Sequence, residues 1–147
     1  MADLKEKTRN AIELFNQHRV GEWLKDFTED AEFVNPLAGR LKGRDAISAH
    51  FTQLYETYPD IKVTAQRILN DGNVIVVEYT VTGTNTGPLP LPTGELLPAT
   101  NKKIEVAAVD VATNDANARI TSIHQYFDAA SALQQLGLMP APAAAHA

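Results

Sequence analysis

Apolar residues recur at spacings of three and four in three separate stretches before Pro59, a pattern typical of helices with one buried face. Asp3 and Glu6 have the spacing of a capping box, so the first helix is expected to begin there. Gly21 interrupts the pattern, a short second helix follows it, and Gly43 opens the third. The apolar positions that define these helices are Leu4, Ala11, Ile12, Leu14, Phe15, Trp23, Leu24, Phe27, Ile47, Phe51, Leu54, Tyr55 and Tyr58.

The rest of the chain has the alternating or continuous apolar runs, rich in Val, Ile, Thr and Tyr, that predict strands. Asp71-Gly72 supplies the positive φ angles of a tight hairpin turn. Residues 86–98 are rich in proline and glycine and predict a long loop. A short helix is expected between Asp128 and Gly137. The expected strands are residues 31–35, 61–69, 74–84, 103–113 and 119–127.

Three helices around one short strand, followed by four longer strands joined mainly by hairpins, predict an α+β domain. Residues 1–138 are expected to form a single domain, because a chain of 147 residues is close to the common domain size. Residues 139–147 are rich in alanine and proline and are expected to be a flexible tail.

Composition excludes several classes of function. Lys and Arg number 13 against 18 Asp and Glu, and the resulting charge of −5 argues against a nucleic-acid surface or a polybasic membrane anchor. The chain has no cysteine, which excludes disulfides, thiolate catalysis and cysteine-ligated metals. Its start is charged rather than apolar, and no apolar run approaches the roughly 20 residues that span a bilayer. A cytoplasmic protein is therefore expected.

A series of short motifs runs through the chain in a fixed order: Asn35-Pro36, Gly43-Arg44-Asp45-Ala46-Ile47, Tyr58-Pro59-Asp60, Asp71-Gly72-Asn73-Val74, Gly83-Thr84-Asn85-Thr86-Gly87 and Gln134-Gln135-Leu136-Gly137-Leu138. Together they resemble the SnoaL-like polyketide cyclase family. The resemblance covers nearly the whole chain, from the first helix to Leu138. Asn85 stands in the middle of a segment where the family has a Gly-Thr-His-Thr-Gly-like sequence.

The resemblance implies the cone-shaped fold of nuclear transport factor two, in which a curved antiparallel sheet carries three N-terminal helices on its concave face and encloses a pocket. In the family's cyclases an acidic residue late in the sheet acts as general acid/base in an aldol ring closure, without metal or organic cofactor. Others on this fold isomerise ketosteroids or hydrolyse epoxides. Fold alone therefore does not fix the function.

Three titratable residues near the end of the chain are the catalytic candidates. His124 shares one face of the last strand with Tyr126 and Asp128, and imidazole titrates near neutrality; the alternative is a hydrogen-bonded histidine at a sheet or dimer surface. Asp110 interrupts an apolar run, so it is either a buried acid/base with a raised pKa or a residue of the outer sheet surface. Asp128 is favoured as a helix N-cap over a catalytic group.

Further residues are expected to line the pocket. Asn35, Asn85 and Tyr126 would orient a substrate or its enolate, since ligand sites combine apolar walls with few polar groups. His18 and His50 are isolated at helical positions and are interpreted as surface or core-edge histidines. No cluster has the spacing of metal ligands. The apolar wall is expected to include Phe15, Trp23, Phe33, Phe51 and Tyr55.

The leading hypothesis is a cofactor-free enzyme that binds a hydrophobic, carbonyl-bearing small molecule and moves protons at the carbon α to the carbonyl, in aldol cyclisation or isomerisation. The alternative is a non-catalytic binder or dimeric scaffold of the same superfamily. A weaker alternative is epoxide hydrolysis, for which Arg67 and Arg119 are available. A homodimer through the sheet is expected, because two-fold dimers are the commonest oligomers.

Overall fold

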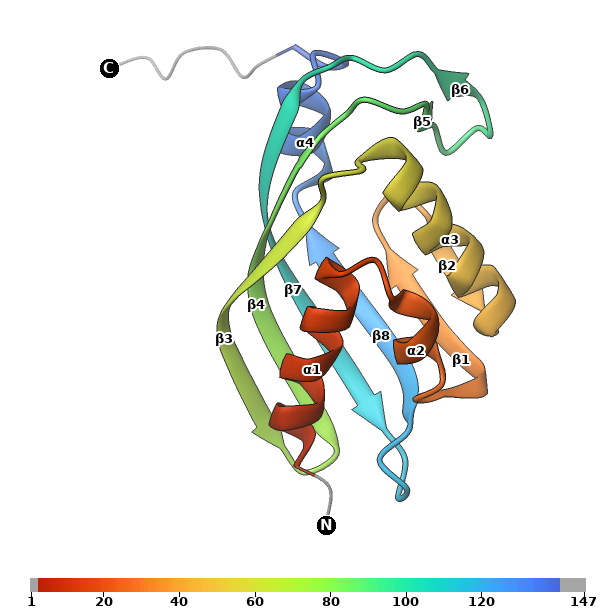
Figure 1. The fold of residues 1–147 in the computed structure, drawn as a ribbon, viewed down its shortest axis with the longest axis vertical. Helices are drawn as coiled ribbons and strands as arrows, with labels where there is room; N and C mark the ends of the chain where they lie inside the picture. Colours follow the sequence, from red (N-terminus) through yellow and green to blue (C-terminus); the bar gives the residue numbers. More distant parts are fainter. Residues whose placement is uncertain (1–2, 141–147) are drawn as a thin grey trace.

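The computed structural model describes residues 3–140, and residues 141–147 of the predicted tail lie outside this range. Four helices and eight strands follow one another along the chain (Figure 1). Their bounds are α1 (Leu4–Asn16), α2 (Val20–Leu24), β1 (Phe27–Asn35), β2 (Gly39–Lys42), α3 (Arg44–Thr57), β3 (Lys62–Asp71), β4 (Val74–Thr84), β5 (Leu89–Pro90), β6 (Leu96–Leu97), β7 (Lys103–Asn114), β8 (Ile120–Phe127) and α4 (Ala129–Gln135). The predicted α+β class is confirmed.

The main sheet has six strands in the order β2-β1-β8-β7-β4-β3. It is mixed rather than wholly antiparallel as expected, because β1 pairs with β8 in parallel. A parallel neighbour requires a long crossover, and most of the chain lies between these two strands. The short edge strand β2 was not predicted; it pairs antiparallel with β1 through the turn after Asn35.

Helices α1, α2 and α3 cover one face of this curved sheet, as predicted, and α4 lies at its upper end (Figure 1). The start of α1 follows the capping prediction, since the Asp3 carboxylate accepts hydrogen bonds from the backbone N–H groups of Lys5 and Glu6. Asn16 fixes the other end of α1 to β3, exchanging two hydrogen bonds of 2.9 and 2.8 Å with the backbone of Val63.

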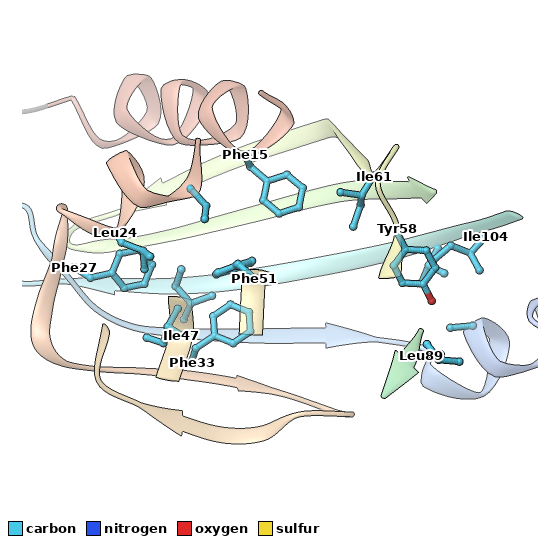
Figure 2. Packing of buried hydrophobic residues seen from close by; sticks show 14 of the residues in the cluster. Phe15, Leu24, Phe27, Phe33, Ile47, Phe51, Tyr58, Ile61, Leu89 and Ile104 are labelled. Carbon is cyan, nitrogen blue, oxygen red and sulfur yellow. The ribbon is translucent and has the colours of Figure 1, made fainter. Parts of the chain in front are cut away.

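An aromatic cluster fills the space between the helices and the β1 side of the sheet. Phe27 and Phe33 of β1 are 0% and 1% exposed (Figure 2). Phe33 packs on Phe51 of α3, Phe51 also meets Phe15 of α1, and Phe27 packs on Trp23 of α2. The Phe33 and Phe51 rings lie edge to face with centroids 5.4 Å apart. Burying four aromatic side chains contributes on the order of 10 kcal/mol in favour of the folded state. This cluster fixes α3 relative to β1.

The predicted loop between β4 and β7 is a folded excursion that contains the two-stranded sheet β5–β6. Asn85 closes its base: its side chain donates to the Gly87 carbonyl and accepts from the Thr100 N–H and hydroxyl, at 2.9, 2.8 and 2.9 Å. Gly87 packs directly on the end of α3, where an added Cβ would lie 1.8 Å from the Glu56 carbonyl oxygen. A larger residue would therefore push the excursion away from α3.

Candidate functional site

Four polar side chains from four neighbouring strands lie in a chain across the concave face of the sheet. Gln125 of β8 stands directly opposite Asp110 of β7 in the strand register. Asn35 of β1 follows Val34, which pairs with His124, so it comes beside Gln125. Alternation along each strand turns these side chains to the face that the helices cover.

Hydrogen bonds join the four side chains in one direction. Asn35 Nδ2 donates to Gln125 Oε1 at 3.2 Å, and Gln125 Nε2 donates to the hydroxyl of Tyr79 on β4. The Tyr79 hydroxyl in turn donates to Asp110 Oδ1 at 2.6 Å. We call these four residues the polar relay. Because Asp110 only accepts, it is the end of the relay and the group whose charge the others stabilise.

The Asp110 carboxyl is a weaker acid than usual. Burial raises its pKa to about 6, and the hydrogen bonds from Tyr79 and Gln125 oppose that shift. None of the ion pairs among residues 3–140 includes Asp110. The same burial, together with the Asp110 charge, raises the pKa of the Tyr79 hydroxyl, which therefore remains a hydrogen-bond donor. At neutral pH this is a carboxylate base with a pKa close to the working range.

The relay opens into a cavity of about 850 Å³ between the sheet and helices α1–α3. This volume lies within the range of pockets for drug-sized molecules. Most of its wall is apolar, and the surface that Asp110 retains faces this space. The cavity runs the length of the sheet, from the start of α1 to the β5–β6 excursion, where Leu89 and Leu91 contribute to the wall.

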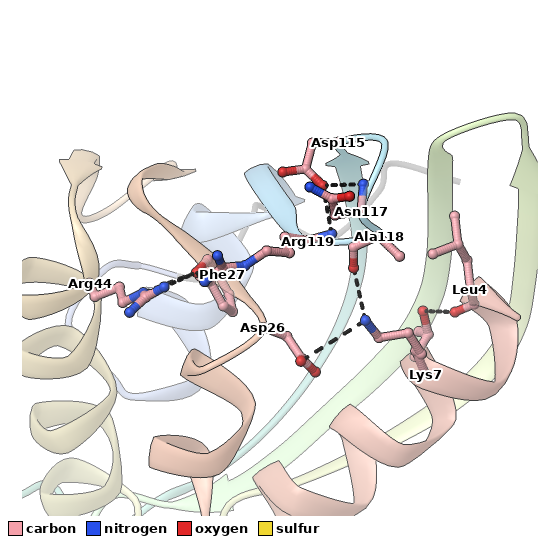
Figure 3. Close-up of polar contacts among 10 residues, drawn as sticks. Leu4, Lys7, Asp26, Phe27, Arg44, Asp115, Asn117, Ala118 and Arg119 are labelled. Carbon is pink, nitrogen blue, oxygen red and sulfur yellow. Dashed lines mark hydrogen bonds and ion pairs between the residues drawn. The ribbon is translucent and has the colours of Figure 1, made fainter. Parts of the chain in front are cut away.

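Charged residues stand at the end of the cavity near the start of α1. Lys7 Nζ donates to the Ala118 carbonyl at 2.8 Å and lies 4.0 Å from Asp26 Oδ1 (Figure 3). Lys7 thereby links α1 to the β7–β8 turn and to the start of β1. Nearby, Arg44 and Arg119 both donate to the Phe27 carbonyl, at 2.6 and 3.1 Å. These contacts hold the lower end of the domain together.

A match to a known family follows the same part of the chain. A sequence model of the SnoaL-like domain matches residues 8–123, which is most of the chain. The chain belongs to the SnoaL-like family. A search of curated proteins finds no match to its sequence. The resemblance predicted from the motifs is therefore confirmed at the level of the family.

Solved structures share the architecture of this SnoaL-like domain. A candidate SnoaL-like polyketide cyclase from a Jannaschia species has a TM-score of 0.80 at 17% identity, covering 93% of each chain. IdmH, a candidate polyketide cyclase from Streptomyces antibioticus, has a TM-score of 0.75 at 19% identity, covering 92% of this chain and 99% of its own. AclR, a candidate hydroxylase from Streptomyces galilaeus, has a TM-score of 0.79 at 15% identity, covering 95% and 99%. At such identities the likeness shows the fold, not the activity.

The predicted catalytic residues of this SnoaL-like domain do not come together. Asp110 lines the cavity, whereas His124 alternates to the outer face of β8, with Tyr126, which is 58% exposed. Asp110 and His124 do not pair, because the neighbouring strands turn these two side chains to opposite faces: Val111, not Asp110, stands opposite His124. Asp128 is exposed and accepts from Ser131 N–H at 3.0 Å as the N-cap of α4. A homodimer through the outer face stays a prediction.

The predicted pocket residues are divided in the same way. Phe15, Trp23, Phe33 and Phe51 line the cavity, and so does Asn35, as part of the relay. Tyr55 is outside the lining: it stacks on His18 with ring centroids 4.1 Å apart and donates to the Phe15 carbonyl. Asn85 is 0% exposed, so its role is the closure of the excursion described above. Arg67 and Arg119, considered for epoxide hydrolysis, are also outside the lining.

Tyr79, Gln125 and His50 line the cavity but were not predicted as site residues. Tyr79 lies in a mainly apolar run of β4, a pattern that predicts a core residue. Gln125 follows His124 on β8 and therefore points to the other face of that strand. His50 was interpreted as a surface or core-edge histidine, yet it faces the cavity from α3. Strand pairing finds the first two: Gln125 stands opposite Asp110, and Tyr79 stands opposite Ala108, two residues from Asp110 on the same face of β7.

Two further searches of residues 3–140 bear on ligands. No group of three or more His, Cys, Asp or Glu residues in this range is arranged to hold a metal ion. In the same range, no helix has the length and apolar character needed to cross a bilayer.

Proposed function

We propose that this SnoaL-like domain binds an uncharged, apolar, carbonyl-bearing molecule and that Asp110 moves protons at the carbon α to the carbonyl. The observation that carries the proposal is one carboxylate with a pKa of about 6 at the end of a hydrogen-bonded relay inside a mostly apolar cavity. A base with this pKa is ionised at neutral pH and still holds a proton well enough to return it.

The relay sets the state of the base. Tyr79 donates to one carboxylate oxygen of Asp110, and Gln125 holds Tyr79 in place. We assign the proton transfer to Oδ2, the carboxylate oxygen that Tyr79 does not contact. Asp110 takes the proton as the α C–H bond breaks, and the electron pair forms an enolate. The enolate then attacks a second carbonyl carbon in the ligand, closing a ring, and the alkoxide formed there takes the proton from Asp110. Alternatively, the enolate takes the proton back from Asp110 at another carbon, giving an isomer.

The test follows proton exchange rather than a specific product. 2-Tetralone is a bicyclic ketone of suitable size, and its α protons exchange for deuterium in D2O at a rate that NMR measures. We expect the wild-type protein to accelerate this exchange over buffer and Asp110→Asn to lose about 100-fold or more of the acceleration. His124→Asn is the matched control, since His124 faces away from the cavity, and it should retain the wild-type rate.

The rival function is binding without chemistry. It would be supported if 2-tetralone bound to both proteins with the same affinity while Asp110→Asn exchanged its α protons as fast as the wild type. In that case the relay would be a structural feature of an apolar binding cavity, and the acid/base role of Asp110 would be wrong.

A further inference from the structure

We propose that His50 donates a hydrogen bond to the carbonyl oxygen of the ligand, from the wall of the cavity that faces the polar relay. This inference rests on the proposed function, because it assigns the partner of the oxygen that gains charge when Asp110 removes a proton. It makes His50 a ligand-binding residue and predicts that the cavity selects carbonyl compounds over hydrocarbons of equal shape.

The position of His50 is fixed by two aromatic rings. Its imidazole lies 5.3 Å from the Phe33 ring and 5.3 Å from the Phe51 ring, measured between centroids. Phe33 is two residues before Asn35 on the same face of β1. His50 on α3 therefore stands above the Asn35 end of the relay, and Asp110 lies two strand spacings farther on, about 10 Å away across the sheet. Because a carbonyl oxygen lies close to its own α carbon, the ligand that spans that separation is a bicyclic or tricyclic one in which the carbonyl is conjugated with the carbon that Asp110 deprotonates.

His50 has polar atoms without a protein partner. Among residues 3–140, no side chain or backbone group forms a hydrogen bond with its imidazole, and its aromatic neighbours offer none. Burial lowers its pKa to about 4, so the ring is neutral at physiological pH. A neutral imidazole has one N–H donor and one acceptor nitrogen. Buried polar groups are normally paired, so a donor left free on a cavity wall is available to a ligand.

The relay itself leaves this role open. The Tyr79 hydroxyl has one hydrogen, and Asp110 accepts it. The Gln125 amide donates to Tyr79, and its hydrogen bond to Asp110 lowers the pKa of that carboxyl, so both of its hydrogens are engaged within the relay. When Asp110 takes the proton, the electron pair of the broken C–H bond moves through the conjugated ring system onto the carbonyl oxygen. That oxygen needs a donor from another element, and the His50 N–H supplies it without transferring its own proton.

The charges of the lining restrict the ligand further. Of the described residues that line the cavity, Lys7 carries the one permanent positive charge, and it is engaged by Ala118 and Asp26 at the end near the start of α1. A ligand carboxylate placed near His50 would meet a neutral imidazole and no positive charge, and the Asp110 carboxylate across the cavity would repel it. The site therefore fits a ketone, an ester or a related neutral carbonyl compound, rather than a free acid.

The experiment compares two tricyclic probes that differ at one position. 9-Fluorenone has a carbonyl group where fluorene has CH2. The affinity of each probe is measured from its displacement of an apolar fluorophore bound in the cavity. We expect His50→Phe, which keeps an aromatic ring but has no donor, to reduce the preference for fluorenone over fluorene by about tenfold relative to wild type. Fluorene affinity should stay within about twofold, since the apolar wall is preserved.

Two controls separate hydrogen bonding from shape. His18→Phe changes the other helical histidine, which stacks on Tyr55 outside the cavity lining, and should leave the preference unchanged. His50→Gln keeps an N–H donor and should retain most of the preference. Asp110→Asn abolishes proton exchange under the proposed function but should keep the fluorenone preference, so the two proposals can fail independently.

A spectroscopic measurement on the wild-type protein gives a second test. The C=O stretching frequency of bound fluorenone should fall when the oxygen accepts a hydrogen bond, and it should return to the value of an apolar solvent in His50→Phe. The proposal is overturned if the stretch already has that apolar value in the wild type. It is also overturned if His50→Phe weakens both probes equally, because His50 would then be part of the wall and nothing more.

Discussion

The two faces of β7 and β8 carry similar kinds of side chain and do different things with them. On the inner face, Asp110 and Gln125 stand opposite each other and join Tyr79 in a hydrogen-bonded relay. The neighbours of Asp110 and Gln125 in the sequence turn to the outer face. There Val111 stands opposite His124, and Val109 stands opposite Tyr126. The inner polar groups are joined by hydrogen bonds and line the cavity, whereas His124 and Tyr126 lie outside the lining and Tyr126 is 58% exposed. Position relative to the cavity, rather than residue type, decides which groups join the relay.

The first prediction moves the carboxylate from one face to the other. The double variant Asp110→Val/Val111→Asp keeps the composition and net charge of the chain but places the acid on the outer face of β7. We expect the acceleration of α-proton exchange to fall to the level of Asp110→Asn, by about 100-fold or more, because general base catalysis needs the base within reach of the bound ligand.

Far-UV circular dichroism of the double variant should match that of the wild type, which separates a misplaced base from a misfolded sheet. If the double variant folds and retains most of the exchange rate, then the inner face is not where the chemistry occurs, and the contrast between the two faces collapses.

The second prediction concerns the free energy of unfolding, which the ionised Asp110 carboxylate lowers. The pKa of Asp110 is raised to about 6 in the folded protein, against 3.8 as its ordinary value. The folded state therefore binds this proton more tightly than the unfolded state does. The resulting stabilisation of the fold is fully present below about pH 4 and is lost as pH rises through about 6. Two pKa units correspond to about 3 kcal/mol. Asp110→Asn does not ionise, so its free energy of unfolding relative to wild type should increase by about 3 kcal/mol between pH 4 and pH 8.

Urea unfolding of the two proteins at both pH values measures this difference. The pKa of His50 is lowered from 6.5 to about 4, so the folded state loses stability as pH falls from 6.5 to about 4. This loss occurs in both proteins alike and cancels in the comparison. An unchanged difference between pH 4 and pH 8 would mean that Asp110 titrates as an exposed carboxyl does.

The third prediction tests the link between Tyr79 and Asp110. The Tyr79 hydrogen bond stabilises the ionised carboxylate and so lowers the pKa of Asp110. Tyr79→Phe removes that donor, and the midpoint of the pH–rate profile for α-proton exchange should move upward by about one pH unit. Tyr126→Phe removes the corresponding hydroxyl on the outer face and should leave the midpoint in place. Equal midpoints in all three proteins would show that the relay does not tune the base.

The smallest effect is expected at His124. His124→Gln changes a half-buried side chain on the outer face, and the free energy of unfolding should change by no more than about 0.5 kcal/mol, as for most surface substitutions. The rate of α-proton exchange should stay within about twofold of wild type. A loss comparable to that of Asp110→Asn would instead place the chemistry on the outer face, against the geometry of the cavity.

Local features of the fold were predictable where a residue acts on its immediate neighbours. The Asp3 cap and the hairpin at Asp71-Gly72 depend on short-range geometry, and both are present in the structure. The parallel pairing of β1 with β8 was not predictable in this way, because it joins segments from opposite ends of the chain. Strand β2 lacked a signal of its own, since Gly39–Lys42 has neither alternation nor β-branched residues.

The site was predictable only in part, because alternation identifies two faces without saying which is inside. Asp110 was found by the conflict between a carboxylate and an apolar run. On β8 neither face is wholly apolar, so the pattern does not say which face is inside. His124 was chosen because imidazole titrates near neutrality, but it is Gln125 that lines the cavity. A cavity makes this ambiguity unavoidable, since the enclosed face of such a sheet needs polar groups that a solid core would exclude.

The closure of the β5–β6 excursion by Asn85 has a consequence for how such proteins diversify. The hydrogen bonds of Asn85 tie both ends of the excursion together at its base, so its interior contributes to the cavity wall without bearing on the pairing of β4 with β7. Segments of other lengths and sequences can replace the excursion between Asn85 and Thr100 without changing the pairing of β4 with β7. Ligand shape can then change in evolution independently of the residues on the sheet that do the chemistry.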